Sequence, residues 1–240
     1  MAESPLSLRF SGCILAASVA VIFSGCWEGT TRGVTATVLA VEGPAIINAD
    51  ARGQSVPLVP GAHTGKGEIL EMTGLSRASI ALLPNLLVQL DRNARLEILR
   101  LAITKDGNET GPAMQARSAN VKLMGGRMIV SQEWGAAIAR FTVTTPHGEL
   151  VTSSNTLFWV ESHEQETRVT CVSGSVGWRR GEADAITGIA PGFVVELTTS
   201  EAKMVAAESD PRGQEDLQEG LEIEEKLRFV ISQNRYALPR

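Results

Sequence analysis

Aromatic side chains are scarce in this sequence of 240 residues. Phe, Trp and Tyr together make up 5% of it, and there is a single tyrosine. Because 43% of the residues are hydrophobic, a core can still form, but it must be built mostly from aliphatic side chains. The 23 glycines and 10 prolines supply many turn residues, which favours short strands. The composition therefore indicates a globular protein with much β structure.

Cysteine, histidine and positive charge are also in short supply. Three cysteines exclude a disulfide-bonded scaffold. A net charge of -5 argues against a protein that binds the phosphates of nucleic acid. His63, His147 and His163 are scattered and form no metal-binding motif. We therefore expect no metal, no cofactor and no nucleic-acid partner.

The N-terminal segment has the parts of an export signal, namely a polar start, an apolar run at residues 14–23 and small residues before a cysteine. Phe23-Ser24-Gly25-Cys26 resembles a lipobox, the bacterial motif whose cysteine is acylated after cleavage. This implies a lipoprotein signal peptide at residues 1–25, a lipid attached to Cys26 and a tether at 26–33.

An uncleaved membrane helix at residues 10–27 is the alternative, because this stretch is just long enough to cross the hydrocarbon core of a membrane. Both interpretations place the rest of the chain outside the cytoplasm and tether it to a membrane. Trp27, which follows the lipobox cysteine, favours the outer membrane, with the protein facing the periplasm or the surface.

Hydrophobic residues alternate with a period of two from residue 34 to about residue 197, which is typical of strands. More than ten short strands separated by turn residues predict a mainly β fold, an antiparallel β-sandwich or barrel-like domain at residues 34–200. The expected strands are residues 35–41, 69–72, 78–82, 86–90, 96–99, 121–123, 127–130, 141–145, 149–153, 157–161, 168–172, 175–178 and 193–197.

Several turns and one long loop separate these strands. Gly125-Gly126, Pro146-His147-Gly148 and Ser173-Gly174 have the residues that turns require. The stretch between Thr104 and Asn120 is polar and lacks periodicity, so we predict a long exposed loop there.

Residues 201–240 differ in character and predict an acidic linker followed by an amphipathic C-terminal helix. Eight acidic residues and only one basic residue lie between Glu208 and Glu225, so the rest of the chain is close to neutral. Gly220 predicts a weak start or a break in the helix. The helix can dock on the β domain or be offered to a partner. Its apolar stripe consists of Ile223, Leu227, Val230 and Ile231.

An ordered series of motifs between residues 34 and 197 resembles the FecR domain. The first half of the series is Val41-Glu42-Gly43, Gly67-Glu68-Ile69 and Ser76-Arg77-Ala78. The second half contains Phe141-Thr142-Val143-Thr144-Thr145-Pro146, Gly148-Glu149-Leu150-Val151 and Gly174-Ser175-Val176. The resemblance implies an extracytoplasmic sensing or binding fold. Regulators of this family also carry a membrane span and a cytoplasmic segment that binds a sigma factor. Only nine residues precede the apolar run here, so we do not expect them to form such a segment.

Four side chains are candidates for a ligand or partner surface, and none for catalysis. Trp134 lies between two expected strands, and His147 occupies an expected exposed turn. Trp159 alternates with Phe158, so one of the two should face outward, and Trp178 precedes two arginines. Core packing is the competing interpretation for each tryptophan. Cys171, within an expected strand, should be a buried thiol.

These observations together predict a non-enzymatic envelope lipoprotein that acts as a ligand-binding, protein-binding or scaffold module. Its partner would be an envelope protein or a glycan. The alternative is a signalling component that passes an envelope stimulus to a separate transmembrane or anti-sigma partner. An envelope hydrolase is the third and weakest hypothesis, because no nucleophile, base or metal site has a convincing spacing.

Overall fold

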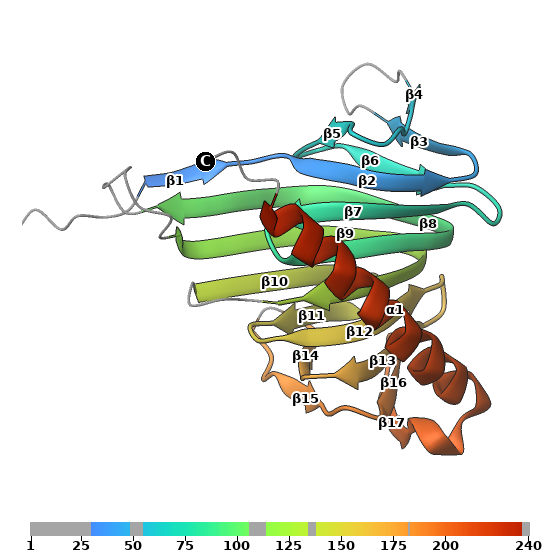
Figure 1. Cartoon of the computed structure of the whole chain (residues 1–240). Coiled ribbons are helices and arrows are strands. Elements are labelled where there is room, and N and C mark those ends of the chain that lie inside the picture. The colour runs from blue at the N-terminus through green and yellow to red at the C-terminus, as the bar shows by residue number, and fades with distance from the viewer. Residues whose placement is uncertain (1–29, 49–54, 106–113, 134–137, 182, 237–240) are drawn as a thin grey trace, which may run out of the picture.

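A computed structural model describes residues 30–48, 55–105, 114–133, 138–181 and 183–236, which form 17 strands and two helices (Figure 1). The first nine strands are β1 (Thr30–Gly33), β2 (Ala36–Glu42), β3 (Ala45–Asn48), β4 (Ser55–Pro57), β5 (His63–Thr64), β6 (Ile69–Met72), β7 (Arg77–Leu83), β8 (Leu86–Lys105) and β9 (Met114–Gln132). The others are β10 (Ile138–Thr145), β11 (Gly148–Thr152), β12 (Thr156–Ser162), β13 (Thr167–Ser173), β14 (Val176–Arg179), β15 (Thr187–Ile189), β16 (Phe193–Leu197) and β17 (Ala202–Ala206). A 3-10 turn η1 (Ala207–Ser209) precedes helix α1 (Pro211–Tyr236).

Two long strands join the two layers of the molecule. The first half of β8 pairs with β7 and with the end of β9, whereas its second half pairs with β6, β1 and the start of β9. We call the layer formed by β5, β2, β7, β8, β9, β12, β13, β16 and β17 the helix-side layer. The far layer contains β4, β3, β6, β1, β8, β9, β10, β11, β14 and β15. The predicted sandwich is thus confirmed, with one parallel pair, β9 and β10.

The bend between the layers comes from residues with a positive φ. In β8, Arg92 and Asn93 have φ values of 46° and 59°, and the register of the ladder shifts between Asp91 and Arg95. Opposite them in β9, Gly126 has a φ of 82°. The Asn93 side chain accepts a hydrogen bond from the backbone N–H of Gly74, in the turn that joins β6 to β7. This hydrogen bond joins the bend in β8 to the turn between β6 and β7.

The predicted turn at Gly125-Gly126 and the predicted loop between Thr104 and Asn120 were both wrong in part. Gly125 and Gly126 belong to one continuous strand, β9, because they form a corner rather than a reversal of the chain. β8 continues to Lys105 and β9 begins at Met114, so much of the expected loop is strand. Polar side chains can alternate along these strands because one of their faces is exposed.

The space between the layers is filled mainly by aliphatic side chains, as the composition predicted. Fully buried examples are Ile80, Leu90, Val121 and Val160, and they come from four strands that alternate inward and outward. Most of the expected strands form at or near their predicted places. Those at residues 69–72 and 193–197 coincide with β6 and β16.

Helix α1 crosses the outer surface of the helix-side layer (Figure 1). Gly220 lies inside the continuous helix, so the predicted break there was wrong. The expected linker after residue 200 was also wrong in part, because residues 202–206 form β17 and pair with β16. Among the described residues, no helix combines the length and the hydrophobicity needed to cross a membrane.

Candidate functional site

The outer surface of the helix-side layer has a second, smaller apolar cluster, and α1 covers it. Trp159 and Val172 contribute to this cluster from β12 and β13, and Leu217 and Ile223 contribute from the helix. Phe158 belongs to the main core, whereas Trp159 belongs to this cluster, as alternation along β12 requires. The surface that Trp159 faces is thus the interface with α1.

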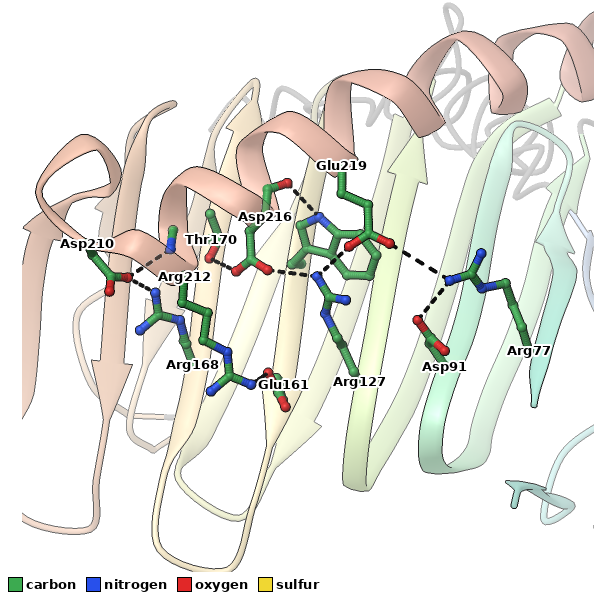
Figure 2. A network of polar contacts seen from close by, with 12 residues as sticks. Arg77, Asp91, Arg127, Glu161, Arg168, Thr170, Asp210, Arg212, Asp216 and Glu219 are labelled. Carbon is green, nitrogen blue, oxygen red and sulfur yellow. Dashed lines mark hydrogen bonds and ion pairs between the residues drawn. The ribbon is translucent and has the colours of Figure 1, made fainter. Parts of the chain in front are cut away.

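A buried arginine lies at the centre of this interface. Nη2 of Arg127, in β9, is 2.7 Å from Oδ1 of Asp216 and 2.9 Å from Oε2 of Glu219, both in α1. Its guanidinium also lies 3.7 Å from the centroid of the Trp159 ring (Figure 2). Only 5% of the Arg127 side chain is exposed, so its charge depends on these partners rather than on water.

Asp216 is the acidic residue that α1 inserts most deeply into the interface. Its second carboxylate oxygen accepts a hydrogen bond of 2.7 Å from the Thr170 hydroxyl. Its backbone carbonyl accepts one of 2.9 Å from Nε1 of Trp159. The aspartate therefore connects β9, β12 and β13 to one turn of the helix, and its buried polar atoms have partners.

Further ion pairs extend in both directions from this centre (Figure 2). Arg168 pairs with Asp210 before the helix and with Glu196 in β16. At the other side, Arg77 lies 3.2 Å from Asp91 and 3.8 Å from Glu219. Three arginines thus form a row across β7, β9 and β13, with β8 and β12 between them, and we call it the arginine row (Arg77, Arg127 and Arg168).

The start of α1 explains why the helix lies so close to the sheet. Asp210 accepts a hydrogen bond from the backbone N–H of Gly213 and thereby caps the helix, which begins with a proline. A Cβ atom on Gly220 would lie 2.7 Å from a methyl group of Val172, and one on Gly213 would lie 2.8 Å from Val194. Both glycines therefore allow the helix to lie close to β13 and β16.

The structure separates the four residues that the sequence proposed for a surface. Trp134 lies outside the described residues. His147 is buried rather than exposed, and its Nδ1 atom lies 3.0 Å from the Thr167 hydroxyl. Trp159 is 1% exposed, under α1. Trp178 is partly exposed and lines a pocket at one end of the sandwich.

The arginine row was not anticipated from the sequence. Arg127 and Arg168 occupy outward positions of strands that the sequence did predict, and the acidic stretch was recognised. The pairing of the arginines with the acidic residues could not be predicted, because β9 and α1 are far apart in the chain. A usable signal was the common helix face of Gly213, Asp216, Gly220 and Ile223.

Cys171 is buried in the core, as expected, and it is the only cysteine among the described residues. Burial raises the pKa of its thiol to about 11. A thiol with this pKa is almost fully protonated at neutral pH and is a poor nucleophile. The described residues also include no cluster of three or more His, Cys, Asp or Glu side chains that could hold a metal ion.

Comparison with known proteins identifies the central part of the chain. Residues 70–177, from β6 to β14, match the model of the family described as FecR protein, so this part of the chain is similar to that family. The resemblance seen in the sequence is thereby confirmed. The matched range includes Arg77, Arg127 and Arg168 but not α1. None of the curated proteins matches the sequence.

Two crystal structures of a candidate anti-sigma factor from Parabacteroides distasonis ATCC 8503 are similar to part of the chain. One is 13% identical, with a TM-score of 0.39, over 56% of this chain and 57% of the other. The second is 15% identical, with a TM-score of 0.38, over 57% of this chain and 58% of the other. The present chain thus spans little more than half the length of either structure.

Proposed function

We propose that the chain is a FecR-type signalling component of the cell envelope, in which the sandwich receives a stimulus and α1 passes it to a separate membrane partner. The association of the FecR family with the envelope supports this location. The observation that carries the proposal is the docking of α1, in which a small apolar cluster is combined with buried ion pairs from Asp216 and Glu219 to the arginine row.

Ion-paired docking is suited to a reversible signal. A helix held by a wide apolar face would lose about 25 cal/mol for each Å² that it exposes on release. Release of α1 would expose only a small apolar cluster and would bring Asp216 and Glu219 into water, which solvates carboxylates well. A partner with a moderate preference for the released helix can therefore shift the equilibrium.

The outward face of α1 is available to such a partner while the helix is docked. Gln214, Gln218, Leu221 and Glu222 are all exposed, and Leu221 is 59% exposed although it is hydrophobic. An exposed leucine among acidic and amide side chains fits an apolar groove with a basic rim, as in the docking of amphipathic helices. We therefore expect first contact at Leu221.

Site-specific photo-crosslinking in intact cells tests this function. A photoreactive residue at Leu221 should crosslink to one membrane protein, and the yield should rise when Arg127→Met weakens the docking of α1. Position 59 is the matched control, since Val59 is 52% exposed and lies between β4 and β5 rather than in α1. Deletion of the gene should also change the transcripts of one envelope-responsive sigma factor.

A passive binding or scaffold module, which the sequence alone favoured, gives a different pattern. Its crosslinks would be the same in wild type and in Arg127→Met, and deletion of the gene would leave sigma-dependent transcripts unchanged. That pair of results would contradict the signalling proposal. Neither function involves catalysis, so we propose no reaction for this chain.

We further propose that the mature chain is a lipoprotein anchored through Cys26, which lies outside the described residues. The tetrapeptide at residues 23–26 supports this proposal. The wild-type protein should enter the detergent phase after phase separation, and its N-terminal peptide should carry the mass of acyl chains. A Cys26→Ala variant that is still found in the detergent phase would contradict the anchor and favour an uncleaved membrane helix.

A further inference from the structure

One end of the sandwich is left open between the edge strands of its two layers. In the part of the chain that is described, β17 pairs only with β16, and β15 pairs only with β14. A pocket of about 310 Å³ opens between these edges. It is lined by Trp178, Thr187, Ile189, Val195, Ala202 and Met204. Apolar side chains of the core are therefore reachable from solvent beside a free strand edge.

The hydrogen-bond register of β17 shows which backbone groups face away from the molecule. The N–H of Ala207 donates to the carbonyl of Gly192 in the neighbouring chain segment. Because antiparallel pairing alternates, the N–H and C=O groups of Val205 and Lys203 also point toward β16. Those of Ala202, Met204 and Ala206 then point outward, along the free edge.

This edge has few of the features that usually prevent strands from pairing between molecules. β17 contains no proline and no bulge, and the inward-facing side chains are Ala202, Met204 and Ala206, none of which is charged. Met204 is 44% exposed, and the neighbouring Phe193 is 37% exposed. Lys203, the only charged residue of β17, belongs to the opposite face of the strand.

We propose that β17 pairs antiparallel with β17 of a second copy of this chain, around a two-fold axis at Met204. In this register Met204 lies opposite Met204 of the second copy, and Ala202 lies opposite Ala206. All the outward backbone groups of the strand then acquire partners, because residues 202, 204 and 206 occupy the hydrogen-bonded positions. The pairing continues the helix-side layer from one molecule into the next.

The side chains of β17 are self-complementary in this register, which is why a second copy is the occupant. The inner face reads small, large, small, so that the two methionines meet with an alanine on either side and cover the mouths of both pockets. On the outer face Lys203 lies opposite Val205 of the second copy, so the two lysines are not directly paired. An isologous contact of this kind closes on itself and gives a dimer.

Cysteine crosslinking of the full chain in its native membrane tests the proposal. Residues opposite each other at a hydrogen-bonded position have Cα atoms about 5.5 Å apart, which a disulfide can bridge. Met204→Cys should therefore form a linked dimer under mild oxidation. Ala202→Cys, on the same face of β17, is the matched control, because the two copies of that residue would be about 14 Å apart. The wild-type protein serves as the control for any crosslinking through its natural cysteines.

The expected result is that Met204→Cys crosslinks at least about tenfold faster than Ala202→Cys. Equal rates for the two variants would overturn the proposal, because random collisions do not distinguish the two positions. Light scattering of the purified protein provides an independent readout. The wild type should dimerise as its concentration rises, and Met204→Lys should stay monomeric with an unchanged melting temperature. A wild type that is monomeric up to high micromolar concentration would overturn the proposal as well.

Discussion

Replacing Arg127 by methionine should detach helix α1 from the sandwich. The methionine retains much of the apolar volume but leaves Asp216 without a positive partner and Glu219 with only Arg77, 3.8 Å away. Removing one member of a buried ion pair costs about 3–5 kcal/mol, and we expect the docking free energy of α1 to fall by that amount. Hydrogen exchange measures it directly, as a loss of protection confined to residues 211–225.

Two variants control this prediction. Arg212 pairs with Glu161 at the edge of the same interface but is 45% exposed, so Arg212→Met should cost less than about 1 kcal/mol. Adding Asp216→Asn to Arg127→Met removes one unpaired carboxylate and should restore part of the protection. The buried arginine would not be the centre of the interface if Arg127→Met and Arg212→Met had equal effects.

Replacing Gly126 by alanine should destabilise the whole sandwich rather than one element. An added Cβ would lie 2.3 Å from the Cα atom and 2.5 Å from the backbone nitrogen of Ala94, at the corner where β8 and β9 bend together. Neither backbone can move without disturbing the ladder between the two strands that join the layers. We expect a loss of about 3 kcal/mol or more in the free energy of unfolding, measured by urea denaturation.

Gly61 separates this steric effect from the effect of the backbone conformation. Its φ of 84° is close to the 82° of Gly126, but nothing lies within 4 Å of an added Cβ. Gly61→Ala should therefore cost only the left-handed strain, about 1–2 kcal/mol. If both variants lost the same stability, the close packing at the corner would not contribute to the stability of the fold.

The strands were predictable because their signal is local. Alternation of buried and exposed positions follows from the strand geometry itself, and β6 and β16 were found at their true bounds. The corners were harder to predict. Gly125-Gly126 has the composition of a reversing turn, and only the stacking of Asn93 and Gly126 in adjacent strands shows that the chain bends and continues.

The candidate site was predictable only in pieces. The acidic stretch and the helix were visible, and so was the alternation of Phe158 with Trp159. Which of the two faces water depends on what covers the outer surface, and α1 covers it, so both are buried. His147 likewise occupies a turn, yet its ring is buried and lies within hydrogen-bond distance of Thr167, from a different layer.

A mainly β chain with an aliphatic core, a resemblance to the FecR domain and an acidic C-terminal helix were all predictable, because they follow from composition, short-range periodicity and ordered motifs. The pairing of Asp216 and Glu219 with arginines from separate strands became visible only in the folded structure, as did the unpaired edge of β17 among the described residues. Both depend on contacts between residues far apart in the chain, which local patterns do not record. The net charge of -5 therefore includes carboxylates that bind the protein's own arginines.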